Sequence, residues 1–208
     1  MHSILEPLLA RPDLPQLVAM LNDQLQQERE RREQFIRDLE PDRKTEFIAG
    51  EVILHSPTRA EHILVTGRLH VLLKMHVLKY GLGEVFVEKA LIHLTRNDYE
   101  PDVLFFGPDK ATLITPDQML FPAPDFIAEV LSDSTEARDR GIKFDDYALH
   151  DVFEYWIFDS FERTIEQYSL LNQHYKLNQK LKAGRLTSLS IPGFEILIAA
   201  LFDCKGSL

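Results

Sequence analysis

Two short apolar runs lie in the middle of the chain, at residues 103–106 and 126–131. A carboxylate directly precedes the first run, and another lies inside the second. Short apolar runs bounded by proline or glycine are typical of β-strands that are buried on both faces. A sheet of such strands needs helices packed on both sides, because its apolar faces must be kept from water. These runs therefore predict a layered α/β fold.

The segments around the two runs supply the other elements of this fold. Gly81 follows a strongly apolar helical stretch, and glycine is the residue expected just beyond a helix end. The expected order is a hairpin at 45–55, a helix at 61–80, strands at 84–94 and 99–106, a loop at 110–124, a strand at 125–131, a helix at 132–150, a strand at 154–158, a hairpin at 164–177 and a short C-terminal helix. Because hairpins impose antiparallel pairs, we expect a mixed sheet flanked by helices.

The N-terminal segment has a heptad pattern that predicts a helix over residues 13–40. Its seam contains Leu14, Val18, Leu21, Leu25, Glu28, Arg32, Phe35 and Leu39, at alternating spacings of four and three. We therefore divide the chain into an N-terminal helical extension, residues 1–44, and an α/β domain, residues 45–208. The helix could pack on its own domain or form a coiled coil in a homodimer, and the sequence leaves both open.

Charge and cysteine content exclude several classes of protein. With 23 Lys and Arg against 33 Asp and Glu, the net charge of −10 excludes a coat that binds nucleic acid by charge alone. A single cysteine, Cys204, excludes an intramolecular disulfide and a cysteine-based zinc site, and it fits a reducing compartment. The longest apolar candidate, residues 63–78, contains Arg68 and Lys74, so no membrane span is expected. We expect a cytoplasmic protein without a secretory signal.

The two carboxylates of the apolar runs are the first candidates for chemistry. Asp102 precedes the run at 103–106, and Glu129 lies inside the run at 126–131. An ionised carboxylate in apolar surroundings is costly unless something stabilises it. If the strands are neighbours, both could converge on one point, where oxygen ligands suit Mg²⁺, with Mn²⁺ as a substitute. The alternative is that each acid faces solvent at a strand end or pairs with an arginine.

Other common catalytic patterns are missing from the sequence. We find no glycine-rich phosphate loop, no serine nucleophile elbow and no Cys–His pair, which excludes P-loop hydrolysis and acyl transfer by a triad. No His-Glu-x-x-His pattern occurs, so no zinc site is expected. Metal-assisted hydrolysis of a phosphodiester is the chemistry that the acid pair suits best.

Several ordered segments resemble the Uma2 family, also called DUF820, of restriction-endonuclease-like proteins within the PD-(D/E)XK nuclease superfamily. The resemblance covers roughly residues 45–203 and rests on residues 46–53 with Ser56-Pro57, Glu61-His62, Pro101-Asp102-Val103, residues 124–132, residues 139–143 with Tyr147, and residues 154–159. It implies a core of helix, three strands, helix and strand. It also implies that Asp102 and Glu129 are metal-binding acids.

The sequence departs from the superfamily pattern at the lysine. The pattern places a lysine two residues after the glutamate, where this chain has Leu131. The resemblance points instead to Lys143 on the following helix, where Arg140, Lys143 and Tyr147 share a face. A lysine there could orient the attacking water or stabilise developing charge. The alternative is an exposed lysine that pairs with a neighbouring aspartate.

Further candidates have weaker signals. Glu51, in the first hairpin, is placed with the catalytic group as a ligand or water-positioning residue. Glu88 could be another ligand, His62 a base or phosphate contact, and Arg140 a companion of Lys143.

These observations together predict a Mg²⁺-dependent endonuclease that acts on nucleic acid, with DNA as the expected substrate. Asp102 and Glu129 would hold the metal, and Lys143 would assist the water. The alternative is a catalytically inactive nuclease-fold protein that acts as an interaction or assembly module. The displaced lysine and the acidic composition favour that alternative.

Overall fold

The computed structural model describes residues 2–40 and 42–203. Cys204 lies outside these residues, so the expectation attached to it is not addressed by the structure. Within the described residues, no helix is both long and apolar enough to cross a membrane.

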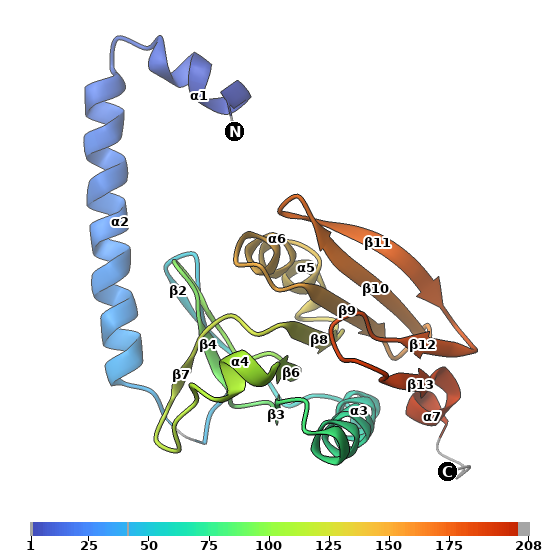
Figure 1. Cartoon of the computed structure of the whole chain (residues 1–208). Helices are drawn as coiled ribbons and strands as arrows, with labels where there is room; N and C mark the ends of the chain where they lie inside the picture. The colour runs from blue at the N-terminus through green and yellow to red at the C-terminus, as the bar shows by residue number, and fades with distance from the viewer. Residues whose placement is uncertain (1, 41, 204–208) are drawn as a thin grey trace.

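A six-stranded mixed sheet forms the centre of the molecule (Figure 1). Its order is β11-β10-β9-β8-β6-β3, in which only the β8–β9 pair is parallel. The strands are β3 (Glu84–Val87), β6 (Val103–Phe106), β8 (Phe126–Val130), β9 (Glu154–Asp159), β10 (Thr164–Leu171) and β11 (His174–Leu181). The predicted mixed sheet is confirmed.

The central strands are buried on both faces, as their apolar runs predict. Val103 and Phe105 of β6 pack in a cluster with α3 (Ala60–Tyr80), whereas Leu104 and Phe106 pack in a second cluster on the other face. The second cluster includes Tyr147 of α6 (Ile142–Leu149). Successive residues alternate between faces, and each face has its own cover, so the sheet is the middle layer.

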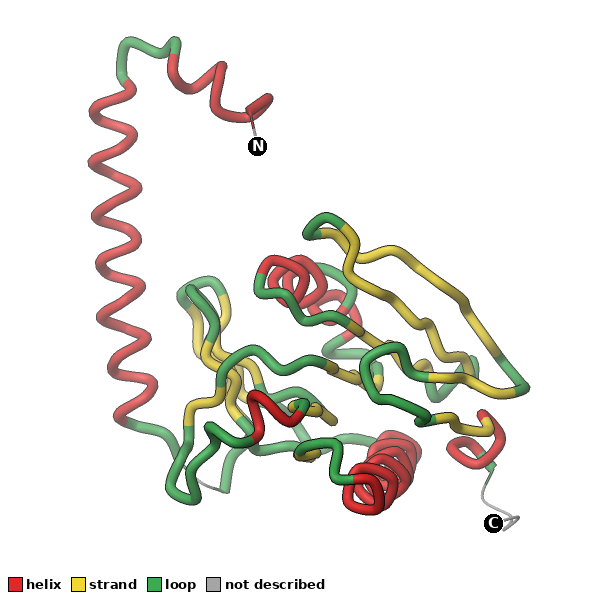
Figure 2. The backbone as a smooth tube through the Cα atoms, in the orientation of Figure 1, coloured by secondary structure: helices red, strands yellow, loops and turns green. Residues whose placement is uncertain are grey.

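A smaller sheet lies beside the central one and brings the first hairpin to it. Its order is β2-β1-β5-β4-β7, with β1 (Thr45–Ile48), β2 (Glu51–Leu54), β4 (Leu91–His93), β5 (Asp98–Tyr99) and β7 (Leu120–Phe121). The remaining elements are α4 (Pro108–Ala111), α5 (Glu136–Asp139), β12 (Arg185–Thr187), β13 (Glu195–Leu197) and α7 (Ile198–Phe202). Figure 2 shows the loops that join them, among them the one between α4 and β7.

Two N-terminal helices precede the domain. After α1 (His2–Leu9), the predicted long helix forms as α2 (Leu14–Arg37), and its N-terminal half extends away from the rest of the molecule (Figure 1). Near its C-terminal end, Phe35 is buried against Phe47 of β1, with ring centroids 5.7 Å apart. The helix thus packs on its own domain over only part of its length.

Four expectations need correction. The strand predicted at 99–106 is two strands in different sheets, since β5 ends at Tyr99 and β6 begins at Val103. The strand predicted at 84–94 is two strands in different sheets, because Glu88 and Lys89 both adopt positive φ, at 45° and 49°. The helix predicted at 132–150 is divided into α5 and α6 around Gly141, where a Cβ would meet the Ala137 carbonyl oxygen at 2.7 Å. The loop predicted at 110–124 contains β7, and α4 overlaps its start.

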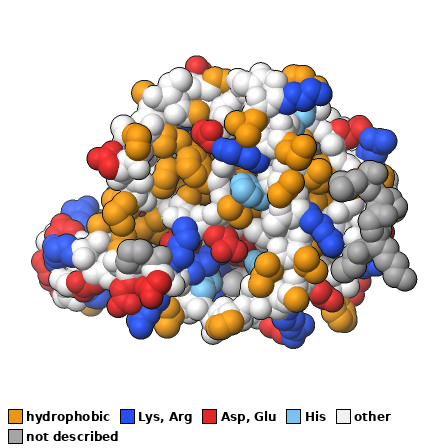
Figure 3. All heavy atoms as spheres, turned by 90° about the horizontal axis from the view of Figure 1, so that it is seen from below, with side chains coloured by type: hydrophobic (Ala, Val, Ile, Leu, Met, Phe, Trp, Pro, Cys, Tyr) orange, Lys and Arg blue, Asp and Glu red, His pale blue; other side chains and the backbone are white. Residues whose placement is uncertain are grey.

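The side of the molecule formed by α3 exposes apolar side chains among charged ones (Figure 3). Val71, Met75 and Leu78 of this helix are exposed, while Leu69 and Leu73 face the core. The helix therefore has one buried apolar stripe and one that faces solvent.

Candidate active site

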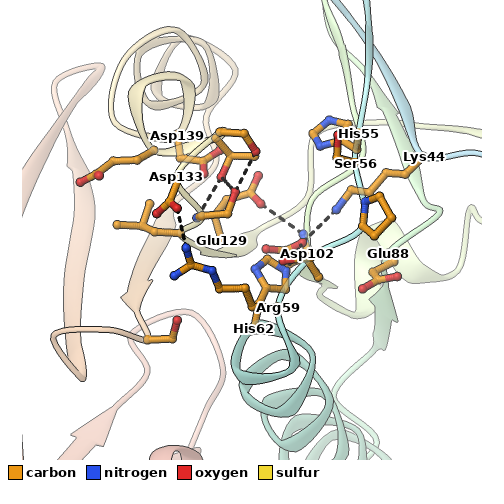
Figure 4. A pocket seen from close by; sticks show the side chains of 18 of the residues that line it. Lys44, His55, Ser56, Arg59, His62, Glu88, Asp102, Glu129, Asp133 and Asp139 are labelled. Atoms are coloured by element: carbon orange, nitrogen blue, oxygen red, sulfur yellow. Dashed lines mark hydrogen bonds and ion pairs between the residues drawn. The ribbon is translucent and has the colours of Figure 1, made fainter.

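The pairing of β6 with β8 places Asp102 beside Glu129. Val103 lies opposite Ala128 in this antiparallel pair, so the next position outward places Asp102 opposite Glu129. The Asp102 N–H donates to Glu129 Oε2 at 3.3 Å, and the Val130 N–H donates to Asp102 Oδ2 at 2.8 Å. Both side chains are buried, and Figure 4 shows them side by side in the pocket.

Asp102 is held by two cationic or basic groups from the cleft wall. Lys44, just before β1, places Nζ 2.9 Å from Asp102 Oδ1, and His62, in the first turn of α3, places Nε2 3.3 Å from the same oxygen. Burial raises the pKa of Asp102, but Lys44 and His62 outweigh it and hold the pKa well below its usual range. Burial lowers the pKa of His62, but the hydrogen bond and charge of Asp102 keep it raised. Asp102 is therefore ionised.

Glu129 belongs to a second group of partners on α6. Its Oε1 accepts from Lys143 Nζ at 3.0 Å and from the Tyr147 hydroxyl at 2.9 Å. Burial raises the pKa of Glu129 even though Lys143 acts against it. The neighbouring carboxylates Asp139 and Asp102 raise it further.

Lys143 is fully enclosed and shared among three carboxylates. Besides Glu129, its Nζ lies 3.0 Å from Glu46 Oε1 and 3.3 Å from Asp139 Oδ1. Burial lowers the pKa of Lys143, but Glu129, Glu46 and Asp139 together raise it well above its usual value. Lys143 therefore stays protonated near neutral pH. The alternative of an exposed helix lysine is wrong in its exposure, although Lys143 does pair with a neighbouring aspartate, Asp139.

Glu46 is the site residue that sequence reasoning missed. It is the second residue of β1, it is 0% exposed, and it accepts from the Glu100 N–H at 3.0 Å while His55 Nε2 lies 2.8 Å from its other oxygen. Burial raises the pKa of Glu46, but Lys143 and His55 outweigh it and lower the pKa to about 2. The signal was available: Glu46 directly precedes two apolar residues of a short strand, as Asp102 does.

The structure places two of the other predicted residues in the cleft lining and two outside it. Glu88 lines the cleft together with His62. Glu51 is exposed at the start of β2 and does not line the cleft, so its predicted place in the catalytic group needs correction. Arg140 pairs with Glu166, from Nη1 to Oε2 at 2.7 Å, and also lies outside the cleft lining.

These side chains meet in one open cleft of about 850 Å³ (Figure 4). Nine carboxylates and four lysines or arginines line it, and Arg59 pairs with Asp133 at its rim, 2.8 Å apart. The cations are Arg43, Lys44, Arg59 and Lys143, and the acids are Asp42, Glu61, Glu88, Asp102, Glu129, Asp133, Glu136, Asp139 and Asp159. The cleft is therefore acidic overall, and a phosphate group entering it needs additional positive charge.

The donor chemistry of Asp102 and Glu129 fits a hard divalent cation. Among the described residues, no three His, Cys, Asp or Glu side chains are grouped as a ready metal cage. Mg²⁺ is usually bound by only one or two carboxylates, with water and substrate phosphate as its other ligands. The Lys44 ammonium lies 2.9 Å from Asp102 Oδ1. A positive charge from the cleft side is therefore already accommodated beside this oxygen. Asp102 and Glu129 are the residues that would hold the metal.

A mixed sheet with paired acids on adjacent strands and a lysine beside them defines the class: a restriction-endonuclease-like α/β fold. A family model described as "Uma2: Putative restriction endonuclease" matches residues 30–200. The chain belongs to the Uma2 family.

Two further comparisons found similar proteins. A protein of Synechocystis sp. described as "Uncharacterized protein sll1609" is 30% identical over 128 residues, which cover 60% of this chain and 71% of the relative. A crystal structure described as a "putative nuclease belonging to DUF820" from Anabaena variabilis has a TM-score of 0.70 at 17% identity, covering 81% of this chain and 94% of the other. At that identity, the likeness establishes the fold alone.

Proposed function

We propose that the protein is a Mg²⁺-dependent endonuclease that hydrolyses phosphodiester bonds of DNA. The observation that carries the proposal is the buried Asp102–Glu129 pair, facing an open cleft with Lys143 against Glu129 at 3.0 Å. Membership of a family described as nucleases supports the reaction class. A cytoplasmic location forms part of the proposal.

Asp102 and Glu129 would hold the divalent cation through their carboxylate oxygens. The chemistry that such a cation supplies is a lowered water pKa and positive charge beside the phosphoryl and leaving oxygens. Asp102 is ready for this role because its pKa lies below the usual range, so no proton has to leave it first. Glu129 has a raised pKa, so cation binding would compete with its protonation.

Lys143 would act by charge and hydrogen bonding. Because three carboxylates hold it as an ammonium, it cannot accept a proton from water near neutral pH. It can orient a water molecule or stabilise negative charge that develops on the phosphoryl group. Glu46 and Asp139 fix its position, since their oxygens lie 3.0 and 3.3 Å from Nζ.

Lys44, Arg43 and Arg59 are the cleft cations available for the DNA backbone. The Lys44 ammonium, which pairs with Asp102, could also donate to a phosphate oxygen of the DNA backbone. Because the chain carries a net charge of −10, we expect DNA affinity to be weak and to fall steeply with salt.

One observation favours a second candidate, a catalytically inactive assembly module. Lys44 neutralises Asp102 and Lys143 is bonded to Glu129, so the acid pair is already stabilised without a metal. In that case the acids would serve only to fix the neighbouring elements. This candidate predicts no nuclease activity on any nucleic acid.

Cleavage of supercoiled plasmid and of labelled oligonucleotides in Mg²⁺ at low salt tests the proposal. We expect wild-type protein to cleave and both Asp102→Asn and Glu129→Gln to lose at least a hundredfold in rate while remaining folded, as checked by circular dichroism. Glu51→Gln is the matched control, because this carboxylate is exposed outside the cleft, and it should keep its activity. Activity retained in both acid variants would overturn the proposal.

A further inference from the structure

The ring of Phe161 is exposed at the cleft and does not contribute to the packing of the core. Its side chain is 81% exposed, more than any other large apolar side chain that the structure describes, and it lines the same cleft as Asp102 and Glu129. The turn between β9 and β10 is closed by Asp159, whose Oδ1 accepts from the Glu162 N–H at 2.8 Å. Full burial of a phenylalanine is worth about 1.5–3 kcal/mol, and this residue forgoes that stabilisation.

Strand pairing fixes where Phe161 stands relative to the acid pair. β8 and β9 are parallel, with Val130 opposite Phe158, and the Leu131 N–H donates to the Phe158 carbonyl oxygen at 2.8 Å. The carboxyl ends of the two strands therefore meet at one edge of the sheet, next to the cleft. Glu129 lies one residue before Val130, and Phe161 lies three residues beyond Phe158. At 3.3 Å per residue, they are at most roughly 13 Å apart along the strands, about four nucleotide steps of 3.4 Å.

The cleft combines this ring with cations that can hold phosphates. Arg59 and Lys44 line the same cleft. Proteins that bind single strands pair a positively charged track for the backbone with aromatic rings on which unpaired bases stack. The flat faces of the bases in an intact duplex are covered by their neighbours, so Phe161 can stack only on an unpaired base or on the last pair of an open end.

The charge of the cleft favours a single strand as well. A duplex carries one negative charge per about 1.7 Å of its axis, whereas a single strand carries one per about 3.4 Å. Nine carboxylates and four cations line the cleft, so a single strand, with its lower charge density, is repelled less than a duplex. We propose that Phe161 stacks on the base of an unpaired nucleotide, which makes single-stranded or locally unpaired nucleic acid the preferred substrate of the site. The inference rests on the proposed nuclease function and names its substrate class.

The test compares one short labelled sequence as a single strand, as a blunt duplex and as a duplex with a single-stranded tail. Binding is measured by fluorescence anisotropy with Ca²⁺ in place of Mg²⁺, and cleavage is measured in Mg²⁺. The variants are Phe161→Ala, Phe161→Leu and Phe161→Trp. Phe153→Ala is the matched control, because Phe153 is 44% exposed just before the opposite end of β9 and does not line the cleft.

We expect wild-type protein to bind and cleave the single strand and the tailed duplex in preference to the blunt duplex. Phe161→Ala should weaken single-strand binding about tenfold and leave blunt-duplex binding unchanged, since stacking is worth about 1–3 kcal/mol per base. Phe161→Trp should bind as wild type, Phe161→Leu should not, and Phe153→Ala should change nothing.

Two results would overturn the inference while the proposed function stands. One is that blunt and tailed duplexes are cleaved equally and Phe161→Ala does not change this. The exposed ring would then be a contact for a protein partner. The other is full rescue by Phe161→Leu, which would indicate apolar contact without stacking. If wild-type protein neither binds nor cleaves any of the three substrates, the proposed function fails and the inference fails with it.

Discussion

Lys143 is the residue on which the electrostatic balance of the site depends. Its ammonium lies within 3.3 Å of carboxylate oxygens of Glu46, Glu129 and Asp139, which are all buried. Removing one partner from a buried ion pair costs about 3–5 kcal/mol, because the remaining charge is left uncompensated. We therefore expect Lys143→Met to lower the free energy of unfolding by about that much at neutral pH, measured by urea denaturation.

A double-mutant cycle with Glu46→Gln isolates the Lys143–Glu46 interaction. Because Glu46→Gln removes one of the unpaired acids, the double variant should recover part of the stability that Lys143→Met loses. If Lys143→Met is as stable as wild type, the ammonium is not needed to keep these carboxylates in the core.

Arg140 has a structural role at Glu166. Glu166 accepts from Arg140, Lys180 and Tyr168, which outweigh burial and lower its pKa to about 2. A carboxylate whose pKa is lowered by folding stabilises the fold above its unfolded pKa, and this contribution is lost as pH falls toward the folded value. Glu166→Gln should therefore be less stable than wild type at neutral pH, and the gap in melting temperature should close near pH 2. A gap of the same size at both pH values would contradict this assignment.

Site residues could be predicted from the sequence where the segment around each of them contained all the evidence for it. Asp102 and Glu129 interrupt or precede apolar runs, and the resemblance to the family supplied Lys143. Glu46 was missed because its partners, Lys143 and His55, come from other parts of the chain. Glu51 was selected by its place in the hairpin, and only the structure shows that it faces solvent.

Among the elements, α2 makes several contacts with the domain, and Arg32 makes the most hydrogen bonds among them. Arg32 binds Asp98 through Nε and Nη2, at 2.6 and 2.8 Å, and donates to the carbonyl oxygens of Leu94, Thr95 and Asn97. Asp98 is fully buried, so loss of Arg32 would leave it without its closest guanidinium partner.

We expect Arg32→Ala to speed hydrogen exchange of the α2 amides near its C-terminal end by at least tenfold. Arg29→Ala is the matched control, because Arg29 is exposed on the same helix. Unchanged exchange in Arg32→Ala would show that the other contacts of α2, among them Phe35 and the Glu28–Arg96 pair, hold the helix in place.

The order of elements was predictable because each central strand carries its own pattern. The exceptions are the segments 84–94 and 99–106, each of which divides between two sheets. In 84–94 the apolar residues continue across Glu88 and Lys89 without a glycine or proline to mark a break. The break comes from tertiary contacts, because the Glu88 N–H donates to the Asp102 carbonyl oxygen at 3.1 Å. Glu88 and Lys89 both adopt left-handed backbone angles there. Sequence patterns within one segment do not reveal such contacts.

At the scale of the whole molecule, the heptad seam of α2 is only half covered. The covered half includes Glu28, which pairs with Arg96, and Phe35. On the other half, Val18, Leu21 and Leu25 are exposed. We propose that a second copy of this chain covers this half, because the seam continues with the same spacing beyond the edge of the domain.

Sedimentation over a range of concentrations tests this assembly. Wild-type protein should approach the mass of a dimer as concentration rises, and Leu21→Lys should remain a monomer because a charge would enter the apolar contact. Leu113→Lys, at an apolar side chain that is 76% exposed elsewhere, should behave as wild type. A wild-type mass that stays monomeric at every concentration would exclude the dimer.

The central claim is that Asp102 and Glu129 hold a divalent cation, and calorimetric titration of Mn²⁺ tests it most directly. Wild-type protein and Asp133→Asn, which alters an exposed carboxylate at the rim, should bind Mn²⁺ with similar affinity. The double variant Asp102→Asn/Glu129→Gln should show no binding under the same conditions. Equal binding by the double variant, or no binding by wild-type protein, would contradict the account.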